Sequence, residues 1–373
     1  MVYLDYSATT PVLPEVLDSY IKVTNEYFGN PNSLHRLGSK SKELLTSAIN
    51  QICEILKIKS SEMVITSGAT EANNMAIIGT ALAHSKQGKH IIVSKLEHDS
   101  VYGICKHLED NGFLIDYVSN NEEGVIDFDD LKKLIRPETI LVSVCAVNSE
   151  LGIRQPLKTI KQVINKENPN TIFHSDMTQG IGKVALNLND VDLASMSSHK
   201  IYGPKGVGLL YKKENLKIKP IMFGSDNDLR PGTPPLPLIV TFAKALRISM
   251  LDLAKKEEKI NKHNIKIINH FKNHTQILIN KTKYSIPHIL NISLMNIKPE
   301  TFIHALEKHD IYVGSNTACS KGKISAATLN IYRDKTRALT TIRISLSHLT
   351  KNEEINLFLE KFDLIYNRLL ELK

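Results

Sequence analysis

The sequence predicts an α/β protein with a large domain built on a mainly parallel sheet and a smaller α/β domain at its C-terminal end. Between about residues 35 and 250, short apolar runs typical of strands alternate with amphipathic stretches typical of helices. A proline-rich segment interrupts this alternation at residues 223–237. The chain has 373 residues, more than one compact core usually holds. We therefore expect two domains, the large one at residues 13–255 and the small one formed by residues 1–12 and 256–373.

Seven apolar runs in the first part are predicted to be strands. They lie at residues 63–66, 90–94, 114–119, 140–147, 171–175, 191–196 and 207–211. Helical periodicity occupies residues 39–56 and 157–165 between them. Strands that alternate with helices favour parallel pairing, and ligands of such sheets bind at the carboxyl ends of the strands.

The remainder of the chain is predicted to form the smaller domain. One long helix is expected over residues 238–270. Further strands are expected at residues 290–294, 311–313 and 341–346, and further helices at residues 301–309 and 352–372. The stretch 326–334 lacks an apolar helix pattern.

Composition excludes several classes of protein. Hydrophobic residues make up 42% of the chain, which argues against disorder. The formal net charge of +8 is compatible with an acidic partner or RNA, but the lysines are scattered, so we expect a solvated surface and no direct nucleic-acid binding. No run of about 18 apolar residues suggests a membrane span, and the N-terminal residues do not resemble a secretion signal. A cytoplasmic location is the expectation.

The four cysteines form no C-x-x-C pair, so no metal site is predicted. Cys53 and Cys145 have apolar neighbours and are expected to be buried, and Cys105 is interpreted as structural. Cys319 lies in a different setting, between glycines and lysines.

A glycine turn follows the first predicted strand, in the sequence Ser67-Gly68-Ala69-Thr70-Glu71. The free N–H groups at the start of the helix that follows can bind an anion such as a phosphate, with help from the Thr70 hydroxyl. The alternative at this point is an ordinary capped helix start.

Three further residues follow strands of the same predicted sheet. Asp176 ends a strand, where a carboxylate needs a cation or several donors, unless it is simply a helix cap. Lys200 follows the next strand, beside Ser197 and His199, and can form a Schiff base with an aldehyde cofactor, unless it is solvated. His98 can stack on a pyridine ring and move protons, unless it is a surface residue.

Together these segments resemble the cysteine desulfurases (NifS/IscS-like) of the class V aminotransferase family, along essentially the whole chain. The matching stretches are Tyr3 to Pro11, Gly29-Asn30-Pro31, Thr66 to Glu71, Glu97-His98, Val147 to Glu150, Ser198 to Gly206 and Thr317 to Ser320. The resemblance implies PLP-dependent transferase fold type I, pyridoxal 5′-phosphate (PLP) as cofactor and L-cysteine as substrate.

The resemblance also implies the role of each site residue. Lys200 is the Schiff-base lysine, Asp176 pairs with the pyridine nitrogen, and His98 stacks on the ring and moves protons. The other implied cofactor contacts are a ring-hydroxyl donor, Gln179, phosphate ligands, Ala69, Thr70, Ser197 and His199, and a ring neighbour, Asn148, which is also near the substrate. Arg343 binds the substrate carboxylate. Thr233 reaches the phosphate of a second subunit, which implies a homodimer with shared active sites.

Cys319 would define the activity, because its thiolate attacks the substrate sulfur and carries it as a persulfide on a segment expected to be mobile. Alanine is the other product. The acceptor is expected to be a thiouridine synthase for tRNA thiolation or an iron–sulfur scaffold. Two alternatives stay open. One is another class V enzyme, such as a selenocysteine lyase or an aminotransferase. The other is a weakly active partner-binding homologue, suggested by unusual residues at 222–230 and 320–335.

Overall fold

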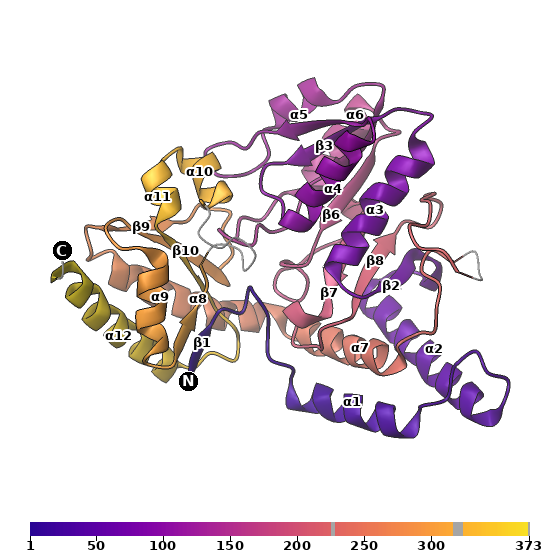
Figure 1. Ribbon diagram of the computed structural model, residues 1–373, viewed down its shortest axis with the longest axis horizontal. Helices are drawn as coiled ribbons and strands as arrows, with labels where there is room; N and C mark the ends of the chain where they lie inside the picture. Colours follow the sequence, from indigo (N-terminus) through magenta and orange to yellow (C-terminus); the bar gives the residue numbers. More distant parts are fainter. Residues whose placement is uncertain (225–227, 316–323, 372–373) are drawn as a thin grey trace.

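The computed structural model describes residues 1–224, 228–315 and 324–371, and it arranges them around one large and two small sheets (Figure 1). The large sheet has seven strands in the order β2-β8-β7-β6-β5-β3-β4. Their bounds are β2 Met63–Thr66, β3 His90–Ser94, β4 Leu114–Val118, β5 Thr139–Ser143, β6 Ile172–Asp176, β7 Leu193–Ser197 and β8 Gly208–Lys212. Strands β3 to β7 pair in parallel, whereas β8 is antiparallel to both of its neighbours. The predicted mainly parallel sheet is confirmed.

Helices cover both faces of the large sheet, because each of its central strands is apolar on both sides. One face packs against α3 (Ala69–His84) and α4 (Asp99–Asp110). The other face packs against α2 (Arg36–Leu56), α5 (Phe128–Leu134), α6 (Leu157–Glu167) and α7 (Leu236–Met250). Helix α1 (Pro14–Glu26) lies against α7 at the edge of the molecule.

The smaller sheets share a second hydrophobic core. Strand β10 (Ile289–Leu294) pairs antiparallel with β9 (Ile277–Asn280) and β12 (Thr341–Ser345). The N-terminal strand β1 (Val2–Leu4) pairs in parallel with β11 (Ile311–Val313), so the two ends of the sequence share this core. Helices α8 (Leu253–Phe271), α9 (Pro299–Glu307) and α12 (Asn352–Glu371) pack around it.

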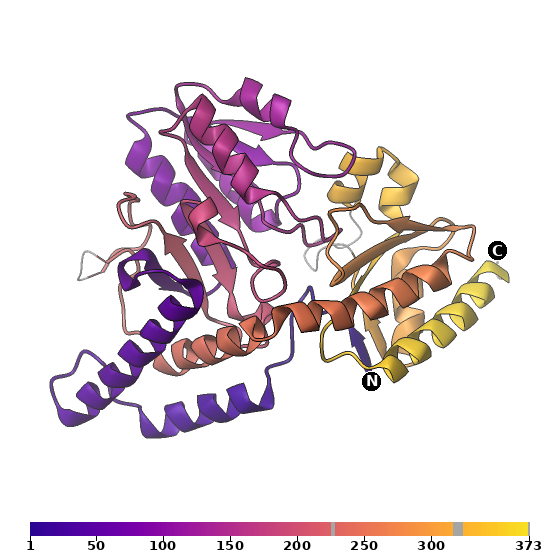
Figure 2. The same cartoon turned by 180° about the vertical axis from the view of Figure 1, so that it is seen from behind.

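The single helix predicted over residues 238–270 is wrong, because the chain breaks between α7 and α8. Leu251 is extended, with a ψ of 137°, and Asp252 is left-handed, with a φ of 50°. The apolar side of α7 faces the large core and that of α8 faces the small one, so the break lets two successive helices face two different cores. Figure 2 shows the two helices following one another from the large sheet to the small ones. The boundary expected at residue 255 falls in the first turn of α8 and stays a prediction.

Residues 326–334, which lack an apolar helix pattern, nevertheless form helix α10 (Ala326–Tyr332), followed by α11 (Lys335–Leu339). Ser325 and Asp334 cap these helices, since each side chain accepts a backbone N–H from the first turn. Short 3₁₀ turns complete the described secondary structure at η1 Ser60–Glu62, η2 Leu188–Asp190 and η3 Ser198–Lys200. Capping hydrogen bonds therefore stabilise these two helices although the sequence shows no apolar helix pattern.

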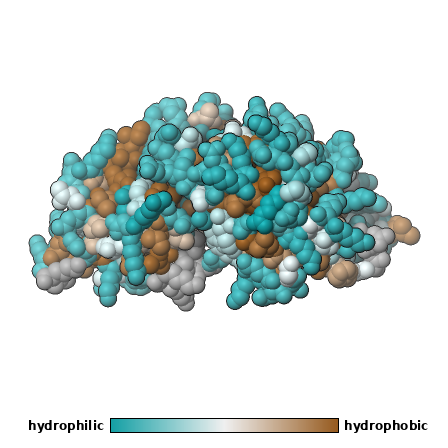
Figure 3. Space-filling view, turned by 90° about the horizontal axis from the view of Figure 1, so that it is seen from above, coloured by the Kyte–Doolittle hydropathy of each residue, from teal (hydrophilic) through white to brown (hydrophobic). Residues whose placement is uncertain are grey.

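Hydrophilic residues cover most of the face drawn in Figure 3, with apolar side chains in separate patches between them. Within the described ranges, no helix combines the length and apolar character that a membrane span requires.

Candidate active site

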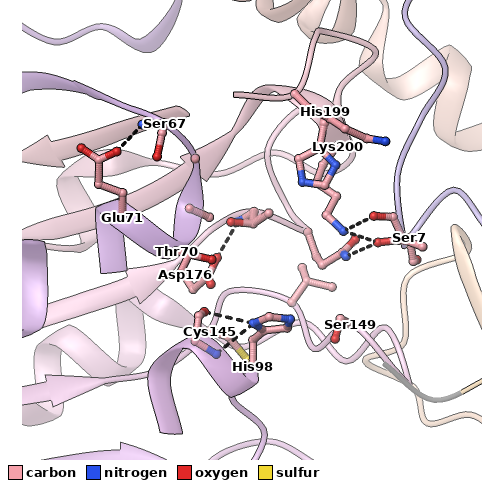
Figure 4. Close-up of a pocket in the computed structure, with 18 of the residues that line it drawn as sticks. Ser7, Ser67, Thr70, Glu71, His98, Cys145, Ser149, Asp176, His199 and Lys200 are labelled. Atoms are coloured by element: carbon pink, nitrogen blue, oxygen red, sulfur yellow. Dashed lines mark hydrogen bonds between the residues drawn. The ribbon is translucent and has the colours of Figure 1, made fainter. Parts of the chain in front are cut away.

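One cavity of about 420 Å³ opens at the carboxyl ends of the central strands (Figure 4), a size typical of small-molecule sites. Loops after β2, β3, β5, β6 and β7 form its wall, together with the N-terminal segment and β12. The predicted site residues that line it are Ala69, Thr70, His98, Asp176, Gln179, His199, Lys200 and Arg343. The structure thus brings these residues together, while their individual roles stay predictions.

The predicted anion loop joins β2 to α3. A Cβ atom at Gly208 would lie 2.5 Å from the Met196 carbonyl oxygen and 2.7 Å from Gly68 Cα, so only glycine lets β8 pass this close to the loop. At the same loop, Glu71 Oε2 accepts a hydrogen bond from the Ser67 backbone N–H at 2.6 Å. The start of the 16-residue helix α3 therefore faces the cavity in a fixed position.

Lys200 ends the short turn η3 and points toward the N-terminal segment. Its Nζ donates hydrogen bonds to the carbonyl oxygens of Ser7 at 2.5 Å and Ala8 at 2.7 Å (Figure 4). Backbone oxygens, which remain in place when the amine reacts, thus orient this amine at the rim of the cavity.

Asp176 is the last residue of β6 and is buried. Its Oδ2 accepts a hydrogen bond from Asn73 Nδ2 at 2.9 Å, and its Oδ1 accepts one from the Thr178 backbone N–H at 2.9 Å. These donors hold the carboxylate against the cavity, which suits a cationic ring nitrogen. Sequence reasoning missed Asn73, because its position on α3 gives no local sign that it reaches another strand.

His98 caps helix α4. Its Nδ1 accepts the backbone N–H of Ser100 at 3.1 Å, so in the neutral ring the proton sits on Nε2. His199 lies across the cavity, with Nδ1 3.1 Å from Thr9 Oγ1. Burial, together with Lys200 and Lys205, lowers the pKa of His199 to about 4, so this ring is neutral near pH 7.

Gln179 connects the site to a buried lysine that the sequence analysis did not single out. Its Nε2 donates to the Ser7 carbonyl oxygen at 2.9 Å, and its Oε1 accepts from Lys183 Nζ at 2.6 Å. Burial, helped by Lys200 and Arg343, lowers the pKa of Lys183 to about 7. A protonated Lys183 can donate hydrogen bonds but cannot accept them. It therefore bonds to the oxygen of the Gln179 amide, and this fixes the orientation of that amide.

Arg343 lies on β12, where 2% of its surface is exposed. Its Nη2 is 2.9 Å from Asp5 Oδ1, and its Nη1 donates to the Ser149 carbonyl oxygen at 3.0 Å. Among the described residues, its buried Nε has no hydrogen-bond partner. A guanidinium held in place by Asp5 and Ser149 at the wall of a cavity suits a small carboxylate ligand.

The remaining predicted residues lie elsewhere. Asn148 is buried behind the wall, where its Nδ2 donates to the Leu96 carbonyl oxygen at 3.1 Å. Ser197 is buried beside the anion loop, and Thr233 is exposed in the segment before α7. Cys319 and its expected mobility fall outside the described residues. The roles of these four residues stay predictions.

Cys53, Cys105 and Cys145 are buried, which confirms the burial predicted for Cys53 and Cys145. Cys145 also lines the cavity, which its apolar neighbours in the sequence do not reveal. Its backbone N–H donates to Glu97 Oε1 at 2.6 Å, and Ser94 Oγ donates to the same atom at 2.5 Å. Burial raises the pKa of Glu97 to about 8.

These features fit pyridoxal 5′-phosphate. The start of α3 and the neutral His199 suit its phosphate, the Asp176 carboxylate suits its ring nitrogen, and the Lys200 amine suits its aldehyde. Arg343 lines the same cavity, where its guanidinium suits the carboxylate of an amino acid.

Comparisons with known proteins agree with this site. The family model described as Aminotransferase class-V matches residues 2–358. A NifS/IcsS protein homolog from Lactobacillus delbrueckii subsp. bulgaricus is 37% identical, over 98% of this chain and 97% of that protein. Cysteine desulfurase IscS from Proteus mirabilis is 36% identical, over 100% of this chain and 94% of that protein.

Solved structures show the same fold. A NifS-like protein superposes with a TM-score of 0.93 at 33% identity, over 98% of this chain and 99% of that one. SspA in complex with cysteine superposes with a TM-score of 0.81 at 29% identity, over 94% of this chain and 100% of that one. The chain belongs to the class-V aminotransferase family, among the NifS/IscS-like enzymes of fold type I that use pyridoxal 5′-phosphate.

Proposed function

We propose that this protein is a cysteine desulfurase that converts L-cysteine to L-alanine and holds the sulfur as a persulfide on Cys319. The observation that carries the proposal is that Lys200, Asp176 and the buried Arg343 line one cavity of amino-acid size. Relatives named as cysteine desulfurases, similar along the whole chain, support the choice of reaction.

The bound cofactor supplies an aldehyde for the substrate amine and a ring that accepts electrons. Arg343 binds the substrate carboxylate, and Asp176 keeps the ring nitrogen protonated. Lys200 Nζ would take the α-proton of the substrate, and the Nε2 of His98 would move protons at the ring. Gln179 orients the ring hydroxyl.

The sulfur step is assigned to Cys319. Its thiolate forms an S–S bond with the substrate sulfur while the Cβ–S bond breaks, and the electron pair of that bond stays with Cβ, which then gains a proton. Cysteine and one thiol thus become alanine and one persulfide, with no external oxidant.

Described residues on both sides of the Cys319 segment contact residues that line the cavity or are sequence neighbours of such residues. Gly314 exchanges backbone hydrogen bonds with Arg343 at 2.9 Å and 2.8 Å. On the other side, Ser325 Oγ donates to Glu150 Oε2 at 2.5 Å. These contacts support the proposal, since the described chain before the segment is joined to the cavity-lining Arg343.

The decisive experiment measures alanine and sulfide after the cofactor-loaded protein is mixed with L-cysteine. Lys200→Ala is expected to lower alanine release at least about 100-fold. Cys319→Ala is expected to abolish persulfide formation, whereas the buried and remote Cys53→Ala serves as the matched control. Unchanged alanine release by Cys319→Ala would refute the persulfide mechanism and favour a class V lyase reaction that frees the sulfur without this thiol.

The acceptor and the assembly are part of the proposal. We infer a homodimer in which Thr233 of one subunit meets the phosphate at the other, since Thr233 is exposed and outside its own cavity. Exposed apolar residues at Phe28 and Leu34, near α1 and α2, favour such a contact. Transfer of ³⁵S from labelled cysteine to a thiouridine synthase or to an iron–sulfur scaffold, compared side by side, distinguishes the two acceptors. The cytoplasmic location stays a prediction.

A further inference from the structure

Two helices of the small domain bring two histidines and one aspartate together, away from the active site. His270 lies in the last turn of α8 and His274 four residues later, in the turn that follows. Asp363 lies on α12, which packs beside α8 (Figure 2). The three side chains thus come from two segments far apart in the sequence.

The ligand atoms of this cluster already converge. One oxygen, Asp363 Oδ1, lies 2.9 Å from His270 Nε2 and 3.2 Å from His274 Nε2. The three atoms are all within 4.8 Å of one another. Ligand atoms around a tetrahedral zinc ion, at about 2.0–2.2 Å from the metal, lie about 3.3 Å apart. A small outward shift of these side chains therefore makes room for an ion.

Aromatic packing holds the two imidazoles in place. The ring of His274 stands edge-on to Phe362 at 6.4 Å and to Tyr366 at 5.5 Å, and His270 meets Phe271 at 5.8 Å. Phe271 and Phe362 belong to the small core. The cluster is thus half-buried on a rigid base: the exposed fractions are 29% for His270, 20% for His274 and 35% for Asp363.

We propose that His270, His274 and Asp363 form a binding site for a divalent transition-metal ion of the zinc class. Two imidazole nitrogens and one carboxylate oxygen are borderline donors, which favour zinc over magnesium or calcium, ions that prefer oxygen ligands alone. The partial exposure leaves the fourth position to water. Bound metal would join the end of α8 to α12 and stabilise the small domain.

Zinc binding by calorimetry tests the site, with the Cys319→Ala holoenzyme as parent so that its reactive thiol does not compete for the metal. The parent is expected to bind one zinc ion per chain at this site, and cobalt in its place should give the visible absorption of tetrahedral coordination. His274→Ala is expected to lower the affinity at least about tenfold. The matched control is His304→Ala, because His304 is exposed on α9 and pairs with one carboxylate only, Glu307, at 2.9 Å.

Asp363→Asn provides a second variant that keeps the size of the side chain, and melting curves without metal check that each variant folds. Zinc should raise the melting temperature of the parent and of His304→Ala, but not that of His274→Ala or Asp363→Asn. Equal zinc affinity in the parent and in both folded cluster variants would overturn the proposal and leave a plain His–Asp–His hydrogen-bonded cluster.

Discussion

Lys183 and Glu97 each bond to a residue that lines the pocket, Gln179 and Cys145 respectively, and burial acts on them in opposite directions. The pKa of Lys183 falls to about 7, and that of Glu97 rises to about 8. Burial is the largest cause in both cases, because each charged form loses water without a partner of opposite charge in direct contact. Both side chains are therefore pushed toward their neutral forms.

Arg343 is equally buried, but it has a carboxylate partner, Asp5. The comparison shows that burial of an ionisable side chain does not by itself create a charged binding site. A buried cation that can bind a substrate anion needs a fixed partner that compensates part of its desolvation. Lys183 and Glu97 instead form hydrogen bonds with Gln179 and Cys145, which line the cavity.

Among substitutions of the buried residues Asp176, Lys183 and Glu97, Asp176→Asn is expected to have the largest effect, which is on alanine release. It replaces a buried carboxylate by a neutral group of the same shape. The Asn oxygen can still accept from Asn73 or Thr178, so the fold should persist while the ring nitrogen loses its anionic partner. Alanine release should fall about 10²–10³-fold. Cofactor content, read from visible absorbance, is the control. Near-normal turnover with full cofactor would show that this carboxylate does not tune the ring.

Lys183→Met should change how stability depends on pH. Between about pH 7 and 10.5, the unfolded chain keeps the Lys183 proton and the folded chain does not, so the free energy of unfolding rises with pH. The slope from this group is up to about 1.4 kcal/mol per pH unit. Urea unfolding of the cofactor-free protein should show this slope in the wild type and not in Lys183→Met. The exposed Lys132→Met is the control, and the same slope in both variants would contradict the assigned burial.

Glu97→Gln should have the opposite effect on the pH dependence of stability, over a range of similar width. Between about pH 4.5 and 8, the folded chain binds the Glu97 proton and the unfolded chain does not, so the stability from this group is lost as pH rises toward 8. Gln keeps the acceptor for Cys145 and Ser94 and mimics the protonated acid. The variant should therefore match the wild type near pH 5 and exceed it in stability near pH 8, in the same urea measurements. A wild type that gains stability over this range relative to the variant would reverse the assignment.

Sequence periodicity predicted the large sheet well, because its central strands are buried along their length and mostly apolar, with polar residues at or just after their carboxyl ends. Asp176 and Lys200 are examples, and both lie at the cavity. The prediction of one continuous helix failed at residues 251–252. The apolar side of the chain faces the large core before this break and the small core after it. Periodicity also missed β1 and β9.

Sequence reasoning could predict a site residue where its chemical group suits one particular role, as with the amine of Lys200 in a glycine-bounded turn. Lys183, Asn73 and Glu97 were not, since their importance depends on burial and on partners that lie far away in the sequence. No local signal reports the desolvation of a side chain.

The parallel pairing of β1 with β11 has a consequence for biosynthesis. Thr10 can bond to His199 as soon as the large sheet exists, but Val2 pairs with Ile311, which leaves the ribosome much later. Ser7 and Ala8, whose carbonyl oxygens hold Lys200, lie between these two anchors. In a nascent chain these two acceptors are therefore expected to reach their final places only when translation is nearly finished. The Lys200 amine should become fully oriented, and the cofactor should bind, late in biosynthesis.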